Sequence, residues 1–305
     1  MFNIKLNPLW SKTVLVITFS FLLLLSSYVL IDPKGSAKNL LSIYSFFAIN
    51  FESLFLYIGF GVLVFLVVIA FSKSGSRKIV LEGRSDYSYF SWYSMLFATG
   101  MGAALLYWST YEWLVYYTNP IEGEEQSLLK ARSYPLFHWM FTGWALYILP
   151  TVAFVFSLMK NPNTPLTFSG ILLKEQSGPI RILLDIFFIG AILTGAGVGL
   201  ALSFPLMSAA ISKLFNLNQT IYLDFLMLLI CMCIVSISVY RGLQNGIKKL
   251  SNFNIILVIT FLTLILVTGP TKYIVINTLE PVTYVLKNYL SLSLFKSQYL
   301  SLIHI

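Results

Sequence analysis

Long apolar stretches separated by short polar segments dominate this chain. A helix needs about 20 mostly apolar residues to cross a membrane. Seven stretches approach that length, which predicts membrane helices at 13–31, 53–71, 89–108, 136–158, 182–205, 221–239 and 253–269. The pattern therefore indicates an all-α membrane protein with about seven transmembrane helices.

Segment 273–290 has a different pattern, because its apolar residues recur at helical spacing with polar residues opposite. This pattern predicts an amphipathic helix that lies on the outer membrane surface. Pro281 falls within the segment and argues against a single unbroken helix.

The composition agrees with a membrane protein. Of 305 residues, 57% are hydrophobic and only 10% are charged, whereas about one-quarter of a soluble domain is charged. Cys231 and Cys233 lie two positions apart in one apolar stretch, so on a helix they point in different directions, and the two histidines, His138 and His304, lie far from them in the sequence. A zinc site needs four ligands that converge, so we expect no metal centre. We find no catalytic Ser/His/Asp grouping, phosphate loop or paired-carboxylate motif, so an enzyme is not expected.

The distribution of Lys and Arg predicts the orientation, because cytoplasmic loops hold the excess of these residues. Twelve of the 20 lie on the side of the N-terminus and eight on the other. We therefore expect a multi-pass protein of the cell inner (cytoplasmic) membrane with a cytoplasmic N-terminus. This bias, together with contact to anionic membrane lipid, explains the net charge of +8 without a nucleic-acid partner.

The run FHWMFTGWALY places Trp139, Trp144 and Tyr147 in the fourth stretch. On one continuous helix they spread over about 12 Å and can line one side of a cavity. Aromatic rings attract quaternary ammonium cations, which donate no hydrogen bond. Core packing or a membrane-interface belt explains the same spacing, so the pattern alone leaves both interpretations open.

Small residues interrupt the third stretch at ATGMGAAL, which contains Gly100, Met101, Gly102, Ala103 and Ala104. In transporters, discontinuous helices expose backbone carbonyls to ions. Small residues also let two helices pack closely. The same two interpretations apply to TGAGVGLA in the fifth stretch, which begins at Thr194.

Four segments together resemble one family. The third stretch, SWYSMLFATGMGAALLYWSTYEW, is similar to W-x-x-M-L-F-A-A-G-M-G-I-G-L-x-F-W-x-x-x-E-P, and PLFHWMFTGWALY is similar to x-L-F-H-W-x-x-H-P-W-x-x-Y. RGLQNGIKKLSNFN and LEPVTYVLKNYLSLSLF resemble later segments in the same order. The chain thus resembles the betaine/choline/carnitine transporter (BCCT) family over nearly its whole length.

The resemblance implies a five-plus-five inverted-repeat transporter with two extra leading helices. Under it, 1–88 holds the cytoplasmic N-terminal segment and the leading helices, 89–272 is the first repeat of five helices, and 273–305 is the surface helix and a truncated tail. The implied function is secondary transport of a small quaternary ammonium compound of the glycine betaine, choline or carnitine type. Homotrimers are usual in the resembling family.

Residue roles follow from the same resemblance. Trp139, Trp144 and Tyr147 would contribute to an aromatic box for trimethylammonium, and 100–104 would be an unwound, substrate-binding segment. In sodium-coupled members, carbonyls that correspond to Ala98 and Met101 hold Na⁺, and Thr194 matches an ion-site threonine. No other cofactor is implied.

The chain departs from the family pattern at several positions. Ala104 replaces the third glycine, Thr142 and Gly143 replace His-Pro, and Trp113 replaces the proline after the glutamate, so the substrate stays open. The chain also stops before the W-T-x-F-Y-W-x-W-W segment that completes the box, and we therefore expect a truncated transporter. The alternative is a non-transporting fragment or a partner-binding membrane subunit.

Overall fold

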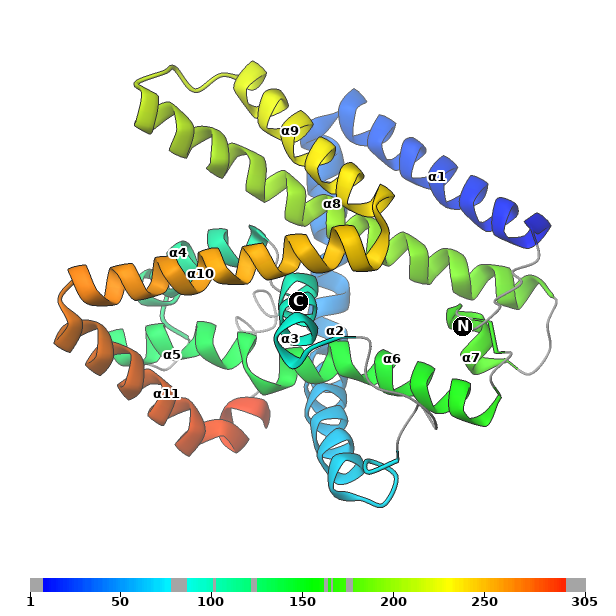
Figure 1. Ribbon diagram of the computed structural model, residues 1–305, viewed down its shortest axis with the longest axis horizontal. Coiled ribbons are helices and arrows are strands. Elements are labelled where there is room, and N and C mark those ends of the chain that lie inside the picture. Colours follow the sequence, from blue (N-terminus) through cyan, green and yellow to red (C-terminus); the bar gives the residue numbers. More distant parts are fainter. Residues whose placement is uncertain are drawn as a thin grey trace.

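The computed structural model describes residues 8–77, 87–100, 103–121, 125–161, 164–165, 167–173 and 178–294. All regular structure in these ranges is helical, which confirms the all-α expectation (Figure 1). Within the same ranges, six segments are long and apolar enough to span a membrane: Lys12–Ile31, Pro33–Phe71, Leu128–Lys160, Pro179–Phe215, Ile221–Tyr240 and Leu243–Thr268. The seventh predicted stretch, 89–108, contains residues 101–102, which lie outside the described residues.

Three helices follow the hydrophobic pattern closely. They are α1 (Pro8–Ile31), α9 (Ile221–Tyr240) and α10 (Lys248–Thr268). A short π-helix, η1 (Leu243–Ile247), connects α9 to α10. Each helix begins or ends within about five residues of its predicted bound, which is normal for boundaries read from a pattern.

Two helices are longer than predicted. Helix α2 (Pro33–Phe71) begins 20 residues before the expected start, because the Asp32 side chain accepts a hydrogen bond from the Gly35 backbone N–H at 3.0 Å and caps the helix. Helix α8 (Pro179–Phe215) continues through Pro205, where the prediction ended, and stops at Asn216 in a left-handed conformation. Hydrophobicity alone did not locate these ends.

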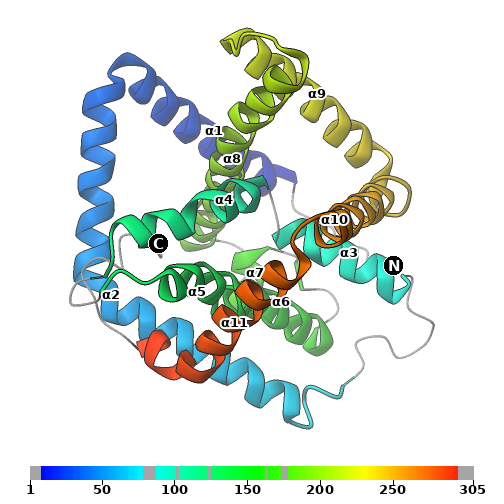
Figure 2. The same cartoon turned by 90° about the vertical axis from the view of Figure 1, so that its left-hand side faces the viewer.

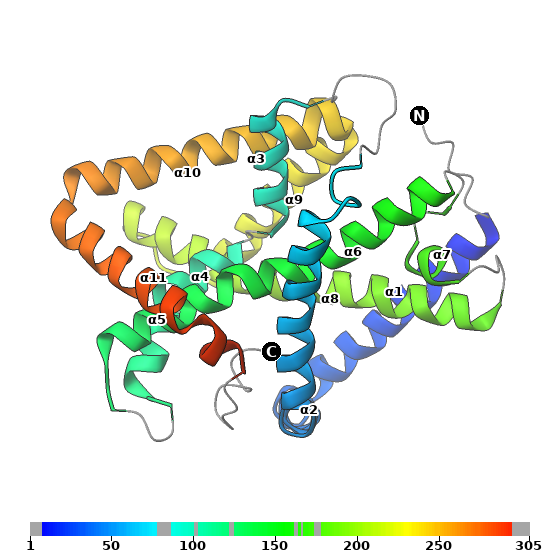
Figure 3. The same ribbon diagram turned by 90° about the horizontal axis from the view of Figure 1, so that it is seen from below.

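The third and fourth stretches each form two helices. Helices α3 (Tyr89–Gly100) and α4 (Ala103–Thr118) run in different directions (Figure 3). Helices α5 (Leu128–Trp139) and α6 (Phe141–Lys160) are separated at Met140, whose φ of −86° and ψ of −135° are not helical. The expectation of one continuous helix over 136–158 is therefore wrong.

The surface segment forms one helix, α11 (Thr271–Leu294), which passes through Pro281 without a break. The expected interruption is thus not observed. Pro281 is buried where α11 packs along α5, and this tertiary contact offsets the hydrogen bond that proline cannot donate.

The helices pack mainly in pairs. Figure 2 shows α3 beside α10 and α11 beside α5, and other contacts join α2 to α6, α1 to α8, and α4 to both α5 and α8. Large apolar side chains on α1, α2, α9 and α10 face outward, including Leu24 and Val267. A surface so apolar is stable against lipid and not against water, which agrees with membrane insertion.

A buried polar network fixes the short helix α7 (Phe168–Leu172) to α8. The Asp185 side chain is only 1% exposed and accepts hydrogen bonds from the Ser169 backbone N–H at 2.8 Å and from the Ser169 hydroxyl. Arg181 Nε donates to the same hydroxyl at 3.0 Å. Because each buried polar group here has a partner, the network stabilises the α7–α8 junction.

Asp185→Ala should destabilise the protein, because the Ser169 N–H would be left buried without an acceptor. We expect a loss of about 1–3 kcal/mol, measured as a lower thermal unfolding temperature in detergent. Asp224→Ala is the matched control, since the buried Asp224 Oδ1 accepts no hydrogen bond within the described residues. Equal unfolding temperatures for Asp185→Ala and the unmodified chain would contradict the role of this network.

Candidate functional site

The Glu112 carboxylate joins α4 to the end of α5. Its side chain is buried, with Oε1 2.5 Å from His138 Nδ1, and Oε2 accepts a hydrogen bond from Trp139 Nε1 at 3.1 Å. Both carboxylate oxygens are therefore engaged by neighbouring residues of α5. The hydrogen bond to Nε1 also fixes the orientation of the Trp139 indole.

A small aromatic core supports this carboxylate. Tyr116 lies with its ring centroid 5.1 Å from that of Tyr134 and 5.7 Å from that of His138. The two tyrosines pack with Ile121 and Ala131 in a buried cluster. Packing on this cluster holds α4 and α5 at a defined spacing, which a binding site needs.

A cavity of about 350 Å³ lies between α4, α5 and α11. On its α11 side, Arg132 donates to Asn277 Oδ1 and to the Tyr273 hydroxyl, the latter at 3.1 Å. The volume is within the usual range for small-molecule sites. Its lining residues are Ser109, Glu112, Trp113, Arg132, Pro135, Leu136, Trp139, Asn277, Thr278 and Pro281. We call it the α4–α5–α11 cavity.

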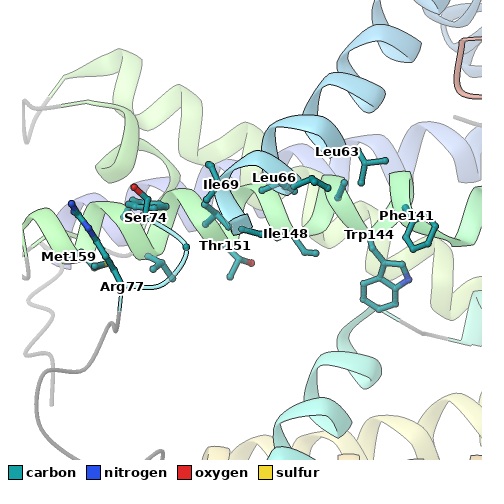
Figure 4. Close-up of a pocket in the computed structure, with 17 residues that line it drawn as sticks. Leu63, Leu66, Ile69, Ser74, Arg77, Phe141, Trp144, Ile148, Thr151 and Met159 are labelled. Atoms are coloured by element: carbon teal, nitrogen blue, oxygen red, sulfur yellow. The ribbon is translucent and has the colours of Figure 1, made fainter. Parts of the chain in front are cut away.

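Trp144 borders two further cavities. One, of about 600 Å³, lies between α2 and α6, where Leu66 and Ile69 stand opposite Ile148 and Thr151 (Figure 4). The other, of about 480 Å³, is lined by residues of α3, α6 and α10. Trp144 therefore lies between an almost wholly apolar cavity and the face of the helix pair α3–α10.

Two of the three aromatic residues predicted for one box, Trp139 and Trp144, border different cavities among those described above. The rings of Trp144 and Tyr147 are 6.4 Å apart, and Tyr147 is 64% exposed. Trp139 lines the α4–α5–α11 cavity instead. The break at Met140 interrupts the helix on which the three residues were expected to lie, and their shared role in an aromatic box stays a prediction.

A glycine permits the break. A Cβ atom on Gly143 would lie 2.7 Å from the His138 carbonyl oxygen. Only a residue without a side chain allows α5 and α6 to approach this closely. The family-like segment has Gly143 where the family has proline, so this departure from the pattern coincides with the helix break.

Of the three predicted ion-binding residues, the structure describes Ala98 and Thr194. Ala98 is half-buried on α3, which packs on α10, whereas Thr194 is exposed on α8. Met101 and Gly102 lie outside the described residues, and so do the side chains of Gly100, Ala103 and Ala104. The roles of the segment 100–104 and of the Na⁺ ligands thus stay predictions.

Sequence reasoning did not assign roles to Glu112, His138, Arg132 and Asn277. Glu112 and His138 stand inside the two family-like segments, as the glutamate of YEW and the histidine of LFHW, so a signal existed. Arg132 and Asn277 are 145 residues apart in the chain, and no local pattern links them.

The helical spans and the apolar exterior define an integral membrane protein. Residues 13–301 match the betaine/carnitine/choline transporter family, BCCT. The chain belongs to this family, whose members are transporters and not enzymes.

Several curated relatives are similar to the chain. The carnitine transporter of Acinetobacter baumannii is 27% identical over 77% of this chain and 44% of its own length. The high-affinity choline transport protein of Escherichia coli K12 is 31% identical over 70% of this chain and 32% of its own. A glycine betaine/proline/choline/ectoine transporter of Vibrio parahaemolyticus is 31% identical over 86% and 48%. The matched region thus covers less than half the length of each.

Gly143→Ala should destabilise the junction of α5 and α6, because the added methyl would collide with the His138 carbonyl. We expect a cost of about 1–3 kcal/mol in thermal unfolding. Gly61→Ala on α2 is the control, since nothing lies within 4 Å of its Cβ position; alanine there should stabilise the helix by up to about 1 kcal/mol. If both variants gain stability, α5 and α6 do not approach as described.

Proposed function

We propose that the protein is a secondary transporter of quaternary ammonium compounds of the glycine betaine, choline or carnitine type. The observation that carries the proposal is the family match over residues 13–301, together with relatives named as carnitine, choline and betaine transporters. Cavities of 350 to 600 Å³ beside Trp139 and Trp144 agree with a small substrate.

The proposal assigns Trp139, Trp144, Tyr147 and the segment 100–104 to the substrate. In this proposal Trp139 contacts substrate in the α4–α5–α11 cavity, and Trp144 contacts it together with Tyr147, whose ring lies 6.4 Å away. Na⁺ is the proposed coupling ion, with Ala98, Met101 and Thr194 as its residues.

The architecture that we propose has α1 and α2 as leading helices and α3 to α10 as the first inverted repeat. In this arrangement α11 lies on the outer surface, and the residues that complete the site come from outside this repeat. Three copies associate as a homotrimer within the lipid. We place the protein in the cytoplasmic membrane with the N-terminus inside.

Cells that lack their own betaine uptake should accumulate labelled glycine betaine, choline or carnitine when they produce this protein. Trp139→Ala and Trp144→Ala should each abolish uptake without changing membrane insertion, because each removes an aromatic contact to the cation. Replacing Na⁺ by K⁺ should lower uptake to background. Insertion is checked by the amount of protein in washed membranes.

Correct insertion without uptake of any of the three compounds would contradict transport by this chain. It would favour the alternative, a partner-binding membrane subunit, which should then copurify with another membrane protein. Unchanged uptake in both tryptophan variants would remove Trp139 and Trp144 from the site.

The orientation gives a separate prediction. In a chain with Cys231 and Cys233 replaced by serine, Gln126→Cys should react with a membrane-impermeant maleimide in intact cells, because the α4–α5 segment faces outward. Ser76→Cys, after α2, should react only once the cells are permeabilised. Both positions are exposed. The reverse labelling pattern would place the N-terminus outside.

A further inference from the structure

The cavity between α2 and α6 is apolar along its length and basic at one end. Figure 4 shows the last turns of α2 against α6, and the segment after α2 brings Arg77 to the same end of the cavity as Met159. Apolar side chains from both helices make up most of the lining, and two of them, Val67 and Ile148, are exposed. We call this cavity the α2–α6 groove, because it is open to the lipid around the protein.

The groove is too narrow for a helix. Trp144 and Met159 line opposite ends of it and are fifteen residues apart on α6. That spacing is about 22 Å along the helix axis, over which a volume of about 600 Å³ gives a channel about 6 Å wide. A helix with its side chains is about 10–12 Å in diameter. The groove therefore accommodates a single hydrocarbon chain, and not a helix from a partner or from a second copy of this chain.

Three basic residues mark one end of the groove. Arg77 lines it, Lys73 precedes the lining residue Ser74, and Lys160 follows the lining residue Met159. All three are exposed, and none of them forms an ion pair with another residue that the structure describes. Basic residues beside a gap between membrane helices favour the headgroup of an anionic lipid. An apolar channel with a cationic end thus has the chemistry of a lipid site.

The other end of the groove meets a residue of the candidate substrate site. Trp144 lines both the groove and the cavity of about 480 Å³ between α3, α6 and α10. An acyl chain extends through about half of the 30 Å hydrocarbon core, so from Arg77 it covers most of the distance to Trp144. A lipid in the groove therefore lies behind the indole, on the side away from α3 and α10.

We infer that the α2–α6 groove binds one acyl chain of an anionic phospholipid. The headgroup lies at Lys73, Arg77 and Lys160, and the chain runs along α6 towards Trp144. With the N-terminus inside, as proposed above, this lipid belongs to the inner leaflet. Binding of the lipid involves no transport step, so the inference goes beyond the proposed function. Its consequence for that function is a lipid contact that limits how far the Trp144 indole moves towards α2.

Two lipids with the same acyl chains and different headgroups test the inference. The purified chain in detergent is titrated with phosphatidylglycerol, which is anionic, and with phosphatidylethanolamine, which carries no net charge. Native mass spectrometry counts the lipids bound to each chain. The first phosphatidylglycerol should bind at least about tenfold more tightly than the first phosphatidylethanolamine, because only it offers net negative charge to the basic end. Equal affinities would overturn the inference.

Variants test the two parts of the groove separately. Arg77→Gln should weaken phosphatidylglycerol binding by about fivefold, whereas Arg241→Gln, the same change at an exposed residue after α9, should alter it by less than about twofold. Val152→Trp should weaken both lipids by about tenfold, because a larger ring occupies the space of the chain. Its control is Val235→Trp, at an exposed position on α9 outside the groove.

Fluorescence quenching tests the course of the acyl chain. Phosphatidylglycerol brominated at the chain ends should quench tryptophan emission when mass spectrometry shows one lipid bound to each chain. Trp144→Phe should remove most of this quenching, and Trp92→Phe, at an exposed position on α3, should leave it in place. Undiminished quenching in Trp144→Phe would place the chain elsewhere and overturn the inference.

Two further results would also contradict a lipid site in this groove. An equal loss of phosphatidylglycerol binding in Arg77→Gln and Arg241→Gln would show a general effect of surface charge. A changed oligomeric state of Val152→Trp with unchanged lipid affinities would show that the groove contacts a second copy of the chain. None of these measurements depends on uptake. Absence of transport therefore leaves the inference standing, and absence of lipid binding leaves the proposed function standing.

Discussion

The candidate site depends on one buried carboxylate, that of Glu112. A charge at this depth is costly unless both of its oxygens are bound, and here His138 and Trp139 occupy them. The same two contacts connect α4 to the last turn of α5, just before the chain leaves helical geometry at Met140. Removing the carboxylate would therefore remove the contacts of both the indole and the imidazole with α4.

The break after Trp139 converts one predicted membrane helix into two elements with different neighbours. Helix α5 contacts α4 and α11, whereas α6 contacts α2. Aromatic side chains that follow each other closely in the sequence thus line separate cavities. The backbone direction at Met140, and not the spacing in the chain, therefore decides which helices surround Trp139 and Trp144.

The hydrophobic pattern predicted α1, α9 and α10 well, because a helix in contact with lipid must be apolar over its whole length. The pattern missed the start of α2, because the Asp32 side chain caps this helix in a segment of mixed polar and apolar residues. It also missed the division at Met140, since methionine is a good helix former and Gly143 breaks the helix only through its approach to His138. The family resemblance gave the function class, which no hydrophobic pattern contains.

The part of the candidate site formed by Arg132 and Asn277 could not be predicted from local sequence patterns. Glu112 and His138 lie within recognisable segments, but Arg132 meets Asn277 across 145 residues of sequence. Helix propensity and amphipathicity describe α5 and α11 separately and give no information on their pairing. Contacts between helices that are far apart in the sequence can be identified only from the three-dimensional structure.

The packing of α11 on α5 determines when the cavity between them forms during synthesis of the chain. A ribosome releases the chain from the N-terminus onward, so α5 reaches the membrane long before α11 is made. Until then Arg132 lacks both of its partners on α11, Asn277 and Tyr273, and the cavity has no third wall. The α4–α5–α11 cavity is thus completed only after α11 has been made, and ribosome stalling or proteolysis before residue 271 would leave the earlier helices without it.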